Sequence, residues 1–400
     1  MSQRFASRVV AAASAGLLVV SLAACSSAKD DPDVVNIGWL GPLTGNAQLE
    51  GEDMLAGVEL YLDVHDNMLG GREVNLTALD EGETADDAMP NAQKLVKQDE
   101  VVALTGILNS PTFMAVAQMS QESGIPLLAS GGRPSVDPAE LNDLKGVWHT
   151  SLVNEYPGQA LAPYVYDEQE GGSVYAIGPD HAGGYGMVGG FAEAYAKEGG
   201  ELANEGGKEP TWTPYPDTAD WTPWLNEIAE SDAKAVFFFY PGANAVDFVT
   251  QYAESEVKDV PLYTSVSTET PQLVAQKEAA LGIKSSVPYS ADLDNAANRE
   301  FVSEWANAND NPPWILPAAA WDAMLVLDTA IGAIPQGEEV TSEKITAEIE
   351  KIGEVNSPRG PWRFGEKTHA PVQRHYLREV RQDGDVISNV VLETLDTLGE

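Results

Sequence analysis

Two short polar segments of this chain contain the residue types from which a binding site for a small anionic ligand can be built. Free backbone amides face the crevice of an open α/β sheet where a strand ends and a helix begins, and they favour an anionic group there. Each segment follows a predicted strand, so we expect both to lie at this crevice. Their residues are Asn109, Ser110, Thr112, Ser130, Gly131, Gly132 and Arg133.

Three glycines, Gly184, Gly186 and Gly189, have the Gly-x-Gly-x-x-Gly spacing of dinucleotide-binding proteins. The preceding predicted strand ends near Gly178, and residues 179–183 intervene where the phosphate-binding turn requires glycine at once. The placement of these glycines after the strand therefore argues against a nicotinamide cofactor, and we expect no cofactor.

Motifs of hydrolases and metal sites are missing from the sequence. It has no Gly-x-Ser-x-Gly elbow and no His-Glu-x-x-His pair, and its five histidines lack metal-ligand spacing. A Ser/His/Asp group assembled only by the fold leaves no mark in a sequence. We expect a protein that is not an enzyme and that holds no metal.

The segments around these residues alternate between strand and helix patterns. This alternation is typical of a parallel sheet with helices on both faces, and it restarts near residue 173. Two doubly wound, Rossmann-like α/β units are therefore expected. The predicted strands are 34–40, 74–79, 101–105, 125–129, 173–178 and 235–240, and the predicted helices are 53–65, 86–98, 111–123 and 187–197.

The late part of the chain has weaker patterns. A strand is predicted at 287–291, a helix at 297–307 and a long apolar helix at 318–334. Two strands, 376–380 and 386–391, form a predicted hairpin across Asp383 and Gly384.

A series of short motifs in a fixed order resembles the type I periplasmic solute-binding proteins, typified by the leucine/isoleucine/valine-binding proteins of ABC importers. The similarity covers nearly the whole chain after its amino end. The motifs are Gly41-Pro42-Leu43-Thr44-Gly45, Gly70-Gly71-Arg72, Asp80, Gly106-Ile107-Leu108-Asn109-Ser110, Gly124-Ile125-Pro126 and Ala129-Ser130-Gly131-Gly132.

The resemblance implies two lobes joined by a hinge of three crossovers, with the ligand enclosed in the cleft when the lobes close. The crossovers are expected near residues 150–153, 266–268 and 364–366. The first lobe then comprises 34–150 plus 268–364, and the second lobe comprises 151–267 plus 365–400.

The resemblance also implies roles for the two polar segments. Ser110 and the stretch from Ser130 to Arg133 match the residues that hold the ligand carboxylate in the family. Relatives often carry Thr where this chain has Gly132 or Arg133. Arg133 is either a bidentate partner for a carboxylate or a solvent-facing loop residue.

Residues of the second lobe are expected at the opposite wall of the cleft. Tyr185 matches the ring that closes over the ligand in the family, and Tyr240 and Gly242 end a strand that faces it. Three tryptophans, Trp212, Trp221 and Trp224, form either a hydrophobic wall of the site or the packing of a long loop.

The position that binds a ligand ammonium group departs from the family pattern. Thr268 and Glu269 lie near the place of the family's acid, but the directly aligned residue is Val266 or Ser267. An α-amino acid is therefore in doubt as the ligand. Glu50, in the loop that lines side-chain specificity in relatives, either selects a cationic or amide group or is simply exposed.

The amino end has the pattern of a bacterial export signal. Arg4 and Arg8 precede an apolar run at 9–20, and Leu22-Ala23-Ala24-Cys25 resembles the lipobox of lipoproteins. Cys25 is also the only cysteine of the chain. We expect a signal peptide at 1–24, lipidation of Cys25 and an acidic tether over 25–33, with no second run of the roughly twenty apolar residues that span a membrane.

The chain is strongly acidic, with 62 acidic against 23 basic residues and a net charge of −39. Such a surface repels nucleic acid and anionic lipid, and it is either a solvated surface suited to salty surroundings or a device to gather cations.

We therefore expect an extracytoplasmic monomer, anchored by lipid to the outer face of the cell membrane. Its expected partners are a small polar ligand and the permease and ATPase of an ABC importer, with no nucleic acid. A branched-chain amino acid-like compound, an amide or an aromatic acid are the candidate ligands. A receptor of the same fold that signals to a regulator or kinase is the alternative.

Overall fold

The structure is a computed structural model that describes residues 33–134 and 136–400. The predicted signal peptide, Cys25 and nearly all of the acidic tether lie outside the described residues. The described residues form one compact unit.

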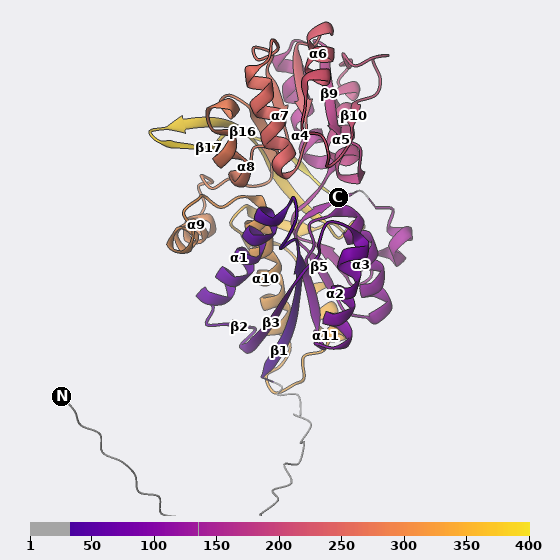
Figure 1. The fold of residues 1–400 in the computed structure, drawn as a ribbon. Coiled ribbons are helices and arrows are strands. Elements are labelled where there is room, and N and C mark those ends of the chain that lie inside the picture. The colour runs from indigo at the N-terminus through magenta and orange to yellow at the C-terminus, as the bar shows by residue number, and fades with distance from the viewer. Residues whose placement is uncertain (1–32, 135) are drawn as a thin grey trace, which may run out of the picture. The chain divides into compact units, whose positions relative to one another are not determined.

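The first lobe is built on a six-stranded sheet with the strand order β2-β3-β1-β4-β5-β7 (Figure 1). Neighbouring strands in this sheet pair in parallel, except that the short β2 pairs antiparallel with β3. Strand β1 reads as an almost continuous apolar run because parallel strands are covered by helices on both faces. The bounds are β1 Val34–Gly41, β2 Met68–Leu69, β3 Arg72–Asp80, β4 Ala103–Gly106, β5 Leu127–Ala129 and β7 Val147–His149, with helices α1 Gln48–Val64, α2 Ala85–Lys97 and α3 Ser110–Ser123 and the 3₁₀ segment η1 Pro138–Leu144.

The second lobe is built on a nine-stranded mixed sheet, with β17 paired to β16 beside the order β10-β9-β11-β12-β13-β16-β15-β14. Strands β9 to β13 run parallel, and β13 pairs antiparallel with β16. The strands are β9 Val174–Pro179, β10 Thr211–Thr213, β11 Ala235–Phe238, β12 Leu262–Thr264, β13 Lys284–Val287, β14 Val355–Ser357, β15 Gly360–Phe364, β16 Pro371–Asp383 and β17 Val386–Leu398. The helices are α4 Glu155–Glu168, α5 Ala182–Lys197, α6 Thr222–Glu230, α7 Gly242–Glu254 and α8 Thr270–Gln276, with the 3₁₀ segment η2 Lys277–Ala280.

The predicted fold class, two doubly wound lobes joined by crossovers, is confirmed by these two sheets. The chain first passes between lobes beside the small parallel pair β6 (Gly132–Arg133) and β8 (Leu152–Val153). It returns to the first lobe after β13, and β14 and β15, which pair onto β16, lead it back into the second sheet.

The second crossover lies later than the sequence indicated. Helix α8 packs on α7, and β13 continues the second sheet beside β12, so these elements belong to the second lobe although residues 268–287 were assigned to the first. Strand β13 has the sequence Lys-Ser-Ser-Val, which gives no apolar run to recognise, and the strand predicted at 287–291 begins three residues earlier.

The chain between β13 and β14 returns to the first lobe as α9 (Ala296–Ala308), α10 (Ile315–Ala333) and α11 (Ser342–Ile349). Helix α10 is long and apolar enough to cross a membrane by length and composition, contrary to the expectation of no second such run. However, 78% of that stretch is buried inside the protein, where α10 packs along α1. It is the central core helix of the first lobe.

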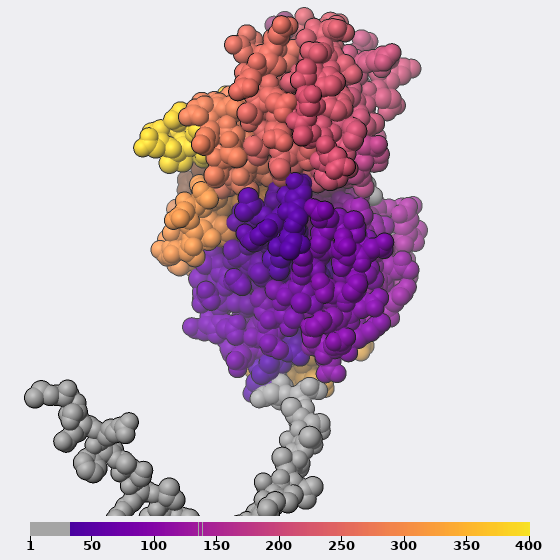
Figure 2. Space-filling view, viewed as in Figure 1, coloured from indigo at the N-terminus to yellow at the C-terminus, as the bar shows by residue number. Residues whose placement is uncertain are grey.

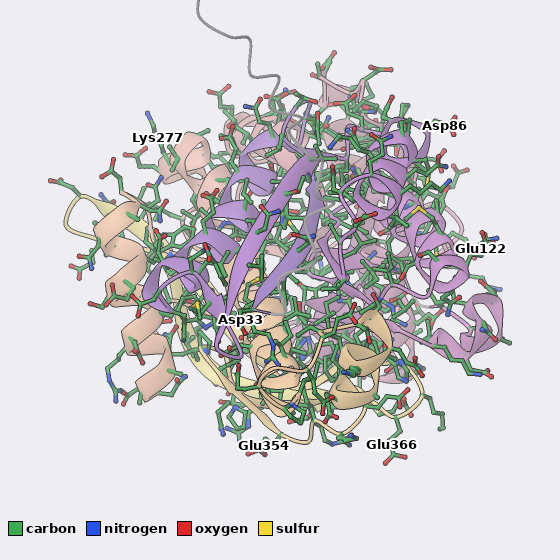
Figure 3. The ribbon with its side chains drawn as sticks, turned by 90° about the horizontal axis from the view of Figure 1, so that it is seen from below. Asp33, Asp86, Glu122, Lys277, Glu354 and Glu366 are labelled. Atoms are coloured by element: carbon green, nitrogen blue, oxygen red, sulfur yellow. The ribbon has the colours of Figure 1, made fainter. Side chains whose placement is uncertain are left out.

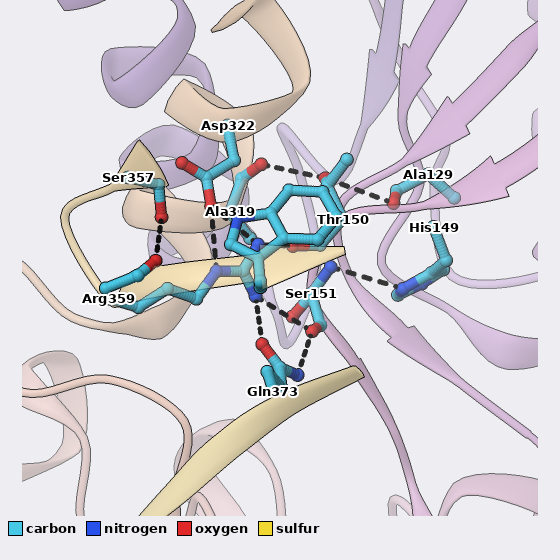
Figure 4. A network of polar contacts seen from close by, with 11 residues as sticks. Ala129, His149, Thr150, Ser151, Ala319, Asp322, Ser357, Arg359 and Gln373 are labelled. Carbon is cyan, nitrogen blue, oxygen red and sulfur yellow. Dashed lines mark hydrogen bonds and ion pairs between the residues drawn. The ribbon is translucent and has the colours of Figure 1, made fainter. Parts of the chain in front are cut away.

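A buried polar network joins the crossovers (Figure 4). Arg359, between β14 and β15, is paired with Asp322 of α10 at 2.6 Å. Arg359 also donates to the carbonyl oxygens of Thr150 and Ser151 at the first crossover and to Gln373 Oε1 of β16. One guanidinium therefore connects α10, the first crossover and the third.

Several acidic side chains lie at the periphery of the molecule. Figure 3 labels Asp86, Glu122, Glu354 and Glu366 at its edge, and all four are exposed. These four carboxylates are therefore in contact with solvent.

Candidate ligand-binding site

A cavity of about 370 Å³ lies between the two lobes, within the size range of small-molecule sites. Its walls are mostly apolar, and the lining of this described cavity includes two carboxylates, Glu50 and Glu83, but no lysine or arginine. The lining residues are Thr44, Asn46, Ala47, Glu50, Gly82, Glu83, Thr84, Leu108, Asn109, Ser110, Pro111, Gly132, Leu152, Asn154, His181, Gly183, Met187, Tyr215, Pro216, Phe239, Pro241, Val266, Gln272, Trp314, Ile315 and Leu316.

The loop between β4 and α3 brings Asn109 and Ser110 to the cavity. Glu81, completely buried behind it, accepts hydrogen bonds from the backbone N–H groups of Leu108 (3.1 Å) and Asn109 (3.0 Å) and from Asn109 Nδ2 (2.8 Å). Ile107 has a φ of 62°, an unusual conformation for a β-branched residue that its surroundings must enforce. Glu81 therefore fixes the loop that presents Ser110.

Ser110 begins α3 and lies against the first crossover. Asn154 Nδ2 donates to Ser110 Oγ at 3.2 Å, which leaves the serine hydroxyl proton available for a ligand. Asn154 Oδ1 is buried without a partner in the described protein. Ser110, Asn154 and Gly132 thus form a polar corner of the cavity.

The second lobe contributes a largely apolar wall. Met187, Phe239, Pro241 and Val266 line it. His181 precedes α5 and is a polar member of this wall. His181 belongs to no spaced motif, so only its residue type could have indicated a role.

Glu50 joins the lobes at the edge of the cavity. Gln272 Nε2 of α8 donates to Glu50 Oε1 at 2.7 Å, and the backbone N–H of Gly242 also bonds the carboxylate. Burial, with a smaller contribution from the charge of Asp53, raises the pKa of Glu50. Of the two interpretations of Glu50, the exposed one is wrong, since 6% of the residue is exposed. Figure 2 shows the indigo start of the first lobe meeting the orange part of the second on this face.

Four predicted site residues, Glu50, Asn109, Ser110 and Gly132, line the cavity together. The other residues predicted from the two polar segments lie just outside the lining. Thr112 and Ser130 are fully buried, and a Cβ at Gly131 would lie 2.3 Å from the Ile107 carbonyl oxygen. These residues are packed behind the residues that form the polar corner.

Arg133 is neither exposed nor part of the cavity lining. It is 2% exposed, and its Nη1 donates to the Thr368 carbonyl oxygen at 2.7 Å. Burial lowers the pKa of Arg133 to about 10. In this arrangement Arg133 attaches the loop after β15 to the first lobe.

The predicted residues of the second lobe also lie outside the lining. Tyr185 is 48% exposed, donates to Asp180 and packs edge-on against Trp212. Tyr240 is buried beside Trp221, so the tryptophan loop is packed into the lobe core. The remaining ones are also buried: Gly242 against Asn46, Ser267 with its Oγ accepting from the Tyr240 N–H, and Thr268 with its carbonyl accepting from Asn389.

Metal binding finds no support in the described part of the chain. No group of three or more His, Cys, Asp or Glu side chains there is placed to hold an ion. A ligand-sized, mainly apolar cavity between two α/β lobes, with a few inward polar groups, defines a two-lobed binding protein.

Comparison with known proteins identifies the family of binding proteins to which this chain belongs. The sequence profile of the periplasmic binding protein family matches residues 34–385. The chain belongs to this family, and it is an extracytoplasmic, non-enzymatic solute-binding protein of the ABC transporter type.

Relatives and solved structures agree with this assignment. Leu/Ile/Val-binding protein homolog 6 from Brucella melitensis is 28% identical over 96% of both chains. An ABC transporter solute-binding protein from R. palustris in complex with benzoate is 26% identical, with a TM-score of 0.80 over 91% of this chain and 98% of that one. Another from the same species, in complex with 4-hydroxybenzoate, is 26% identical with a TM-score of 0.81, again over 91% and 98% of the two chains.

Proposed function

We propose that this protein captures a small aromatic carboxylic acid in the cavity and delivers it to an ABC permease. The observation that carries this proposal is the mainly apolar lining of the cavity, which has no acid at the position that the resemblance aligns with the ammonium-binding acid of amino-acid-binding relatives. Of the two acids in the lining, Glu83 is exposed, and its Oε1 accepts from the Asn46 N–H at 2.9 Å. The aligned residue is Val266 or Ser267, neither of which is an acid, and Val266 lines the cavity.

The neighbouring acid does not replace it. Glu269 is 1% exposed, forms a buried ion pair with Arg378 and does not line the cavity. The Glu50 carboxylate accepts hydrogen bonds from Gln272 and Gly242, and burial raises its pKa, which disfavours the charged form that would bind an ammonium group.

The shape and chemistry of the walls fit a flat apolar ring with an acidic group. Phe239, Trp314 and Leu316 are among the apolar residues available to a ring. The hydroxyl of Ser110 is available to a carboxylate at the polar corner. Relatives solved with benzoate and 4-hydroxybenzoate support this ligand class.

Calorimetric titration of the purified protein with benzoate, 4-hydroxybenzoate and isoleucine tests the proposal. We expect at least one aromatic acid to bind at least tenfold more tightly than isoleucine, which lacks a partner for its ammonium group. Tighter binding of isoleucine would contradict the proposal and favour Glu50 as the ammonium partner.

Ser110→Ala tests the polar corner. Loss of a hydrogen bond to a charged group costs about 1.5–3 kcal/mol, so we expect roughly 10- to 100-fold weaker binding of the aromatic acid. Ser123→Ala is the matched control, because Ser123 ends the same helix and bonds only to the Ser120 carbonyl oxygen. Equal affinity of both variants would place the carboxylate elsewhere.

We also propose that Cys25 is lipidated and anchors a monomer at the outer face of the cell membrane. The support is the lipobox-like Leu22-Ala23-Ala24-Cys25 after an apolar run. The expected result is a membrane-bound wild type with a mass increase at Cys25, and a released Cys25→Ser variant. A membrane-bound Cys25→Ser variant would contradict lipid anchoring through this residue.

A further inference from the structure

His181 has a fixed orientation at the start of α5. Its backbone is extended, and its Nδ1 accepts hydrogen bonds from the N–H groups of Gly183 (2.9 Å) and Gly184 (3.4 Å). A side chain in this position caps the helix. Because a ring nitrogen that accepts hydrogen bonds carries no proton, the neutral imidazole must carry its proton on Nε2.

The Nε2–H group has no acceptor within the described protein. Nε2 is buried, and no hydrogen-bond partner lies within reach of it. The carboxylate of Asp180, whose charge acts on His181, accepts from the Tyr185 hydroxyl instead. Tyr215 packs edge-on against the imidazole at 4.5 Å between ring centroids, which holds the ring in place. A buried donor without an acceptor is costly, so a partner from outside the chain is expected.

His181 lines the ligand cavity, so the cavity is where this donor can find an acceptor. Desolvation by burial, partly opposed by the charge of Asp180, lowers the pKa of His181 to about 4. The ring is therefore neutral at physiological pH, and the donor is an uncharged N–H.

We infer that His181 is a ligand-binding residue that donates a hydrogen bond from Nε2 to an oxygen atom of the bound solute. The inference rests on the proposed function and specifies it further. The second lobe selects solutes that present a carboxylate, carbonyl or hydroxyl oxygen to it. A solute held by His181 and by Ser110 is attached to both lobes, which couples its capture to their closure.

The test is His181→Ser, measured by calorimetry with benzoate and 4-hydroxybenzoate. Serine is a favoured capping residue and preserves the start of α5, but it is too short to replace Nε2. We expect roughly 10- to 100-fold weaker binding and an unchanged melting temperature of the ligand-free protein. Thr341→Ser, which exchanges the capping residue of α11 outside the cavity lining, is the matched control and should bind as wild type does.

The tautomer is measured independently of any ligand. Nitrogen-15 NMR of the ligand-free protein should show His181 protonated at Nε2, and the Nε2 resonance should shift when the aromatic acid binds. Protonation at Nδ1, or equal affinity of His181→Ser and wild type, would overturn the inference. Failure of both aromatic acids to bind the wild type would instead contradict the proposed function, while the tautomer would still decide whether His181 presents a donor.

Discussion

At the residue scale, Glu81 is a carboxyl group that supports the site without lining the cavity. It holds the backbone of Leu108 and Asn109, and hence the start of α3, through three hydrogen bonds. Burial raises its pKa to about 8, although the hydrogen bonds from Asn109 and Leu108 oppose this shift. A buried acid with this pKa makes folding depend on pH.

The sign of that dependence follows from the two protonation states. The folded protein holds the Glu81 proton up to about pH 8, whereas the unfolded chain releases it near its ordinary value of 4.5. Raising the pH between these values therefore lowers the free energy of unfolding. We predict that Glu81→Gln loses less stability than wild type between pH 5 and 8, measured by urea denaturation. Parallel pH profiles for the two proteins would contradict the raised pKa.

Asn109 and Ser110 could be predicted as site residues because they lie at the start of a helix after a parallel strand, where free backbone amides face the crevice of the sheet. No role for Glu81 or His181 was predicted from the sequence. Glu81 is adjacent to the family landmark Asp80, but only the fold shows that its side chain meets the loop 28 residues later. His181 gains its role from a tautomer that is set by the α5 amides, and a sequence contains no record of it.

At the element scale, the starts of α1 and α7 approach each other across the lobes. Gly242, the first residue of α7, has a φ of 52°, and a Cβ there would lie 2.8 Å from the Asn46 carbonyl oxygen. Its N–H also bonds Glu50. A side chain at this position would keep the lobes apart.

We predict that Gly242→Ala weakens binding of the aromatic acid about tenfold, because closure then requires the Asn46 loop to move. Gly282→Ala is the matched control, since Gly282 also has a positive φ, of 84°, but no atom lies within 4 Å of the added methyl group. Both variants should lose about 1 kcal/mol of stability from backbone strain. Only Gly242→Ala should lose affinity, and equal affinities would contradict the role of this contact.

The elements themselves were predicted best where periodicity was strong. The strands β1, β3, β4 and β5 and the helices α1 to α3 match their predicted positions to within about five residues, because buried parallel strands and amphipathic helices have distinct apolar patterns. The two-residue strand β2 was not predicted. Short elements such as β13 and α8 carry no such pattern, and tertiary pairing alone defines them. This is why the second crossover was placed too early.

At the scale of the whole molecule, the Arg359 network connects the segments that join the lobes. Arg359 is 3% exposed and Asp322 is fully buried, and Trp362 Nε1 donates to the same Asp322 oxygen at 3.1 Å. The network includes the backbone carbonyl oxygens of Thr150 and Ser151 at the first crossover. Desolvation raises the pKa of Asp322, and the charge of Arg359 opposes this shift.

Removing one partner of such a pair leaves a buried charge without compensation, which costs about 3–5 kcal/mol, whereas replacing both partners by apolar residues is far less harmful. We predict that Arg359→Met lowers the free energy of unfolding by about this amount and that adding Asp322→Leu restores much of it. Protonation of the unpaired Asp322 should also make Arg359→Met recover stability as the pH falls, because the folded protein then holds a proton that the unfolded chain releases.

The comparison that separates a hinge role from simple core stability is Arg72→Met. Arg72 is equally buried, but it bonds carbonyl oxygens at the end of α10 within the first lobe, away from the crossovers. Both variants should be destabilised, yet only the double variant and Arg359→Met lose the bonds to Thr150 and Ser151 that connect the lobes. We therefore expect small-angle scattering to show a changed distribution of interlobe distances, and calorimetry a changed affinity, in the Arg359 variants alone. Identical scattering and affinity in wild type and the double variant would mean that the network stabilises the junction without governing its motion.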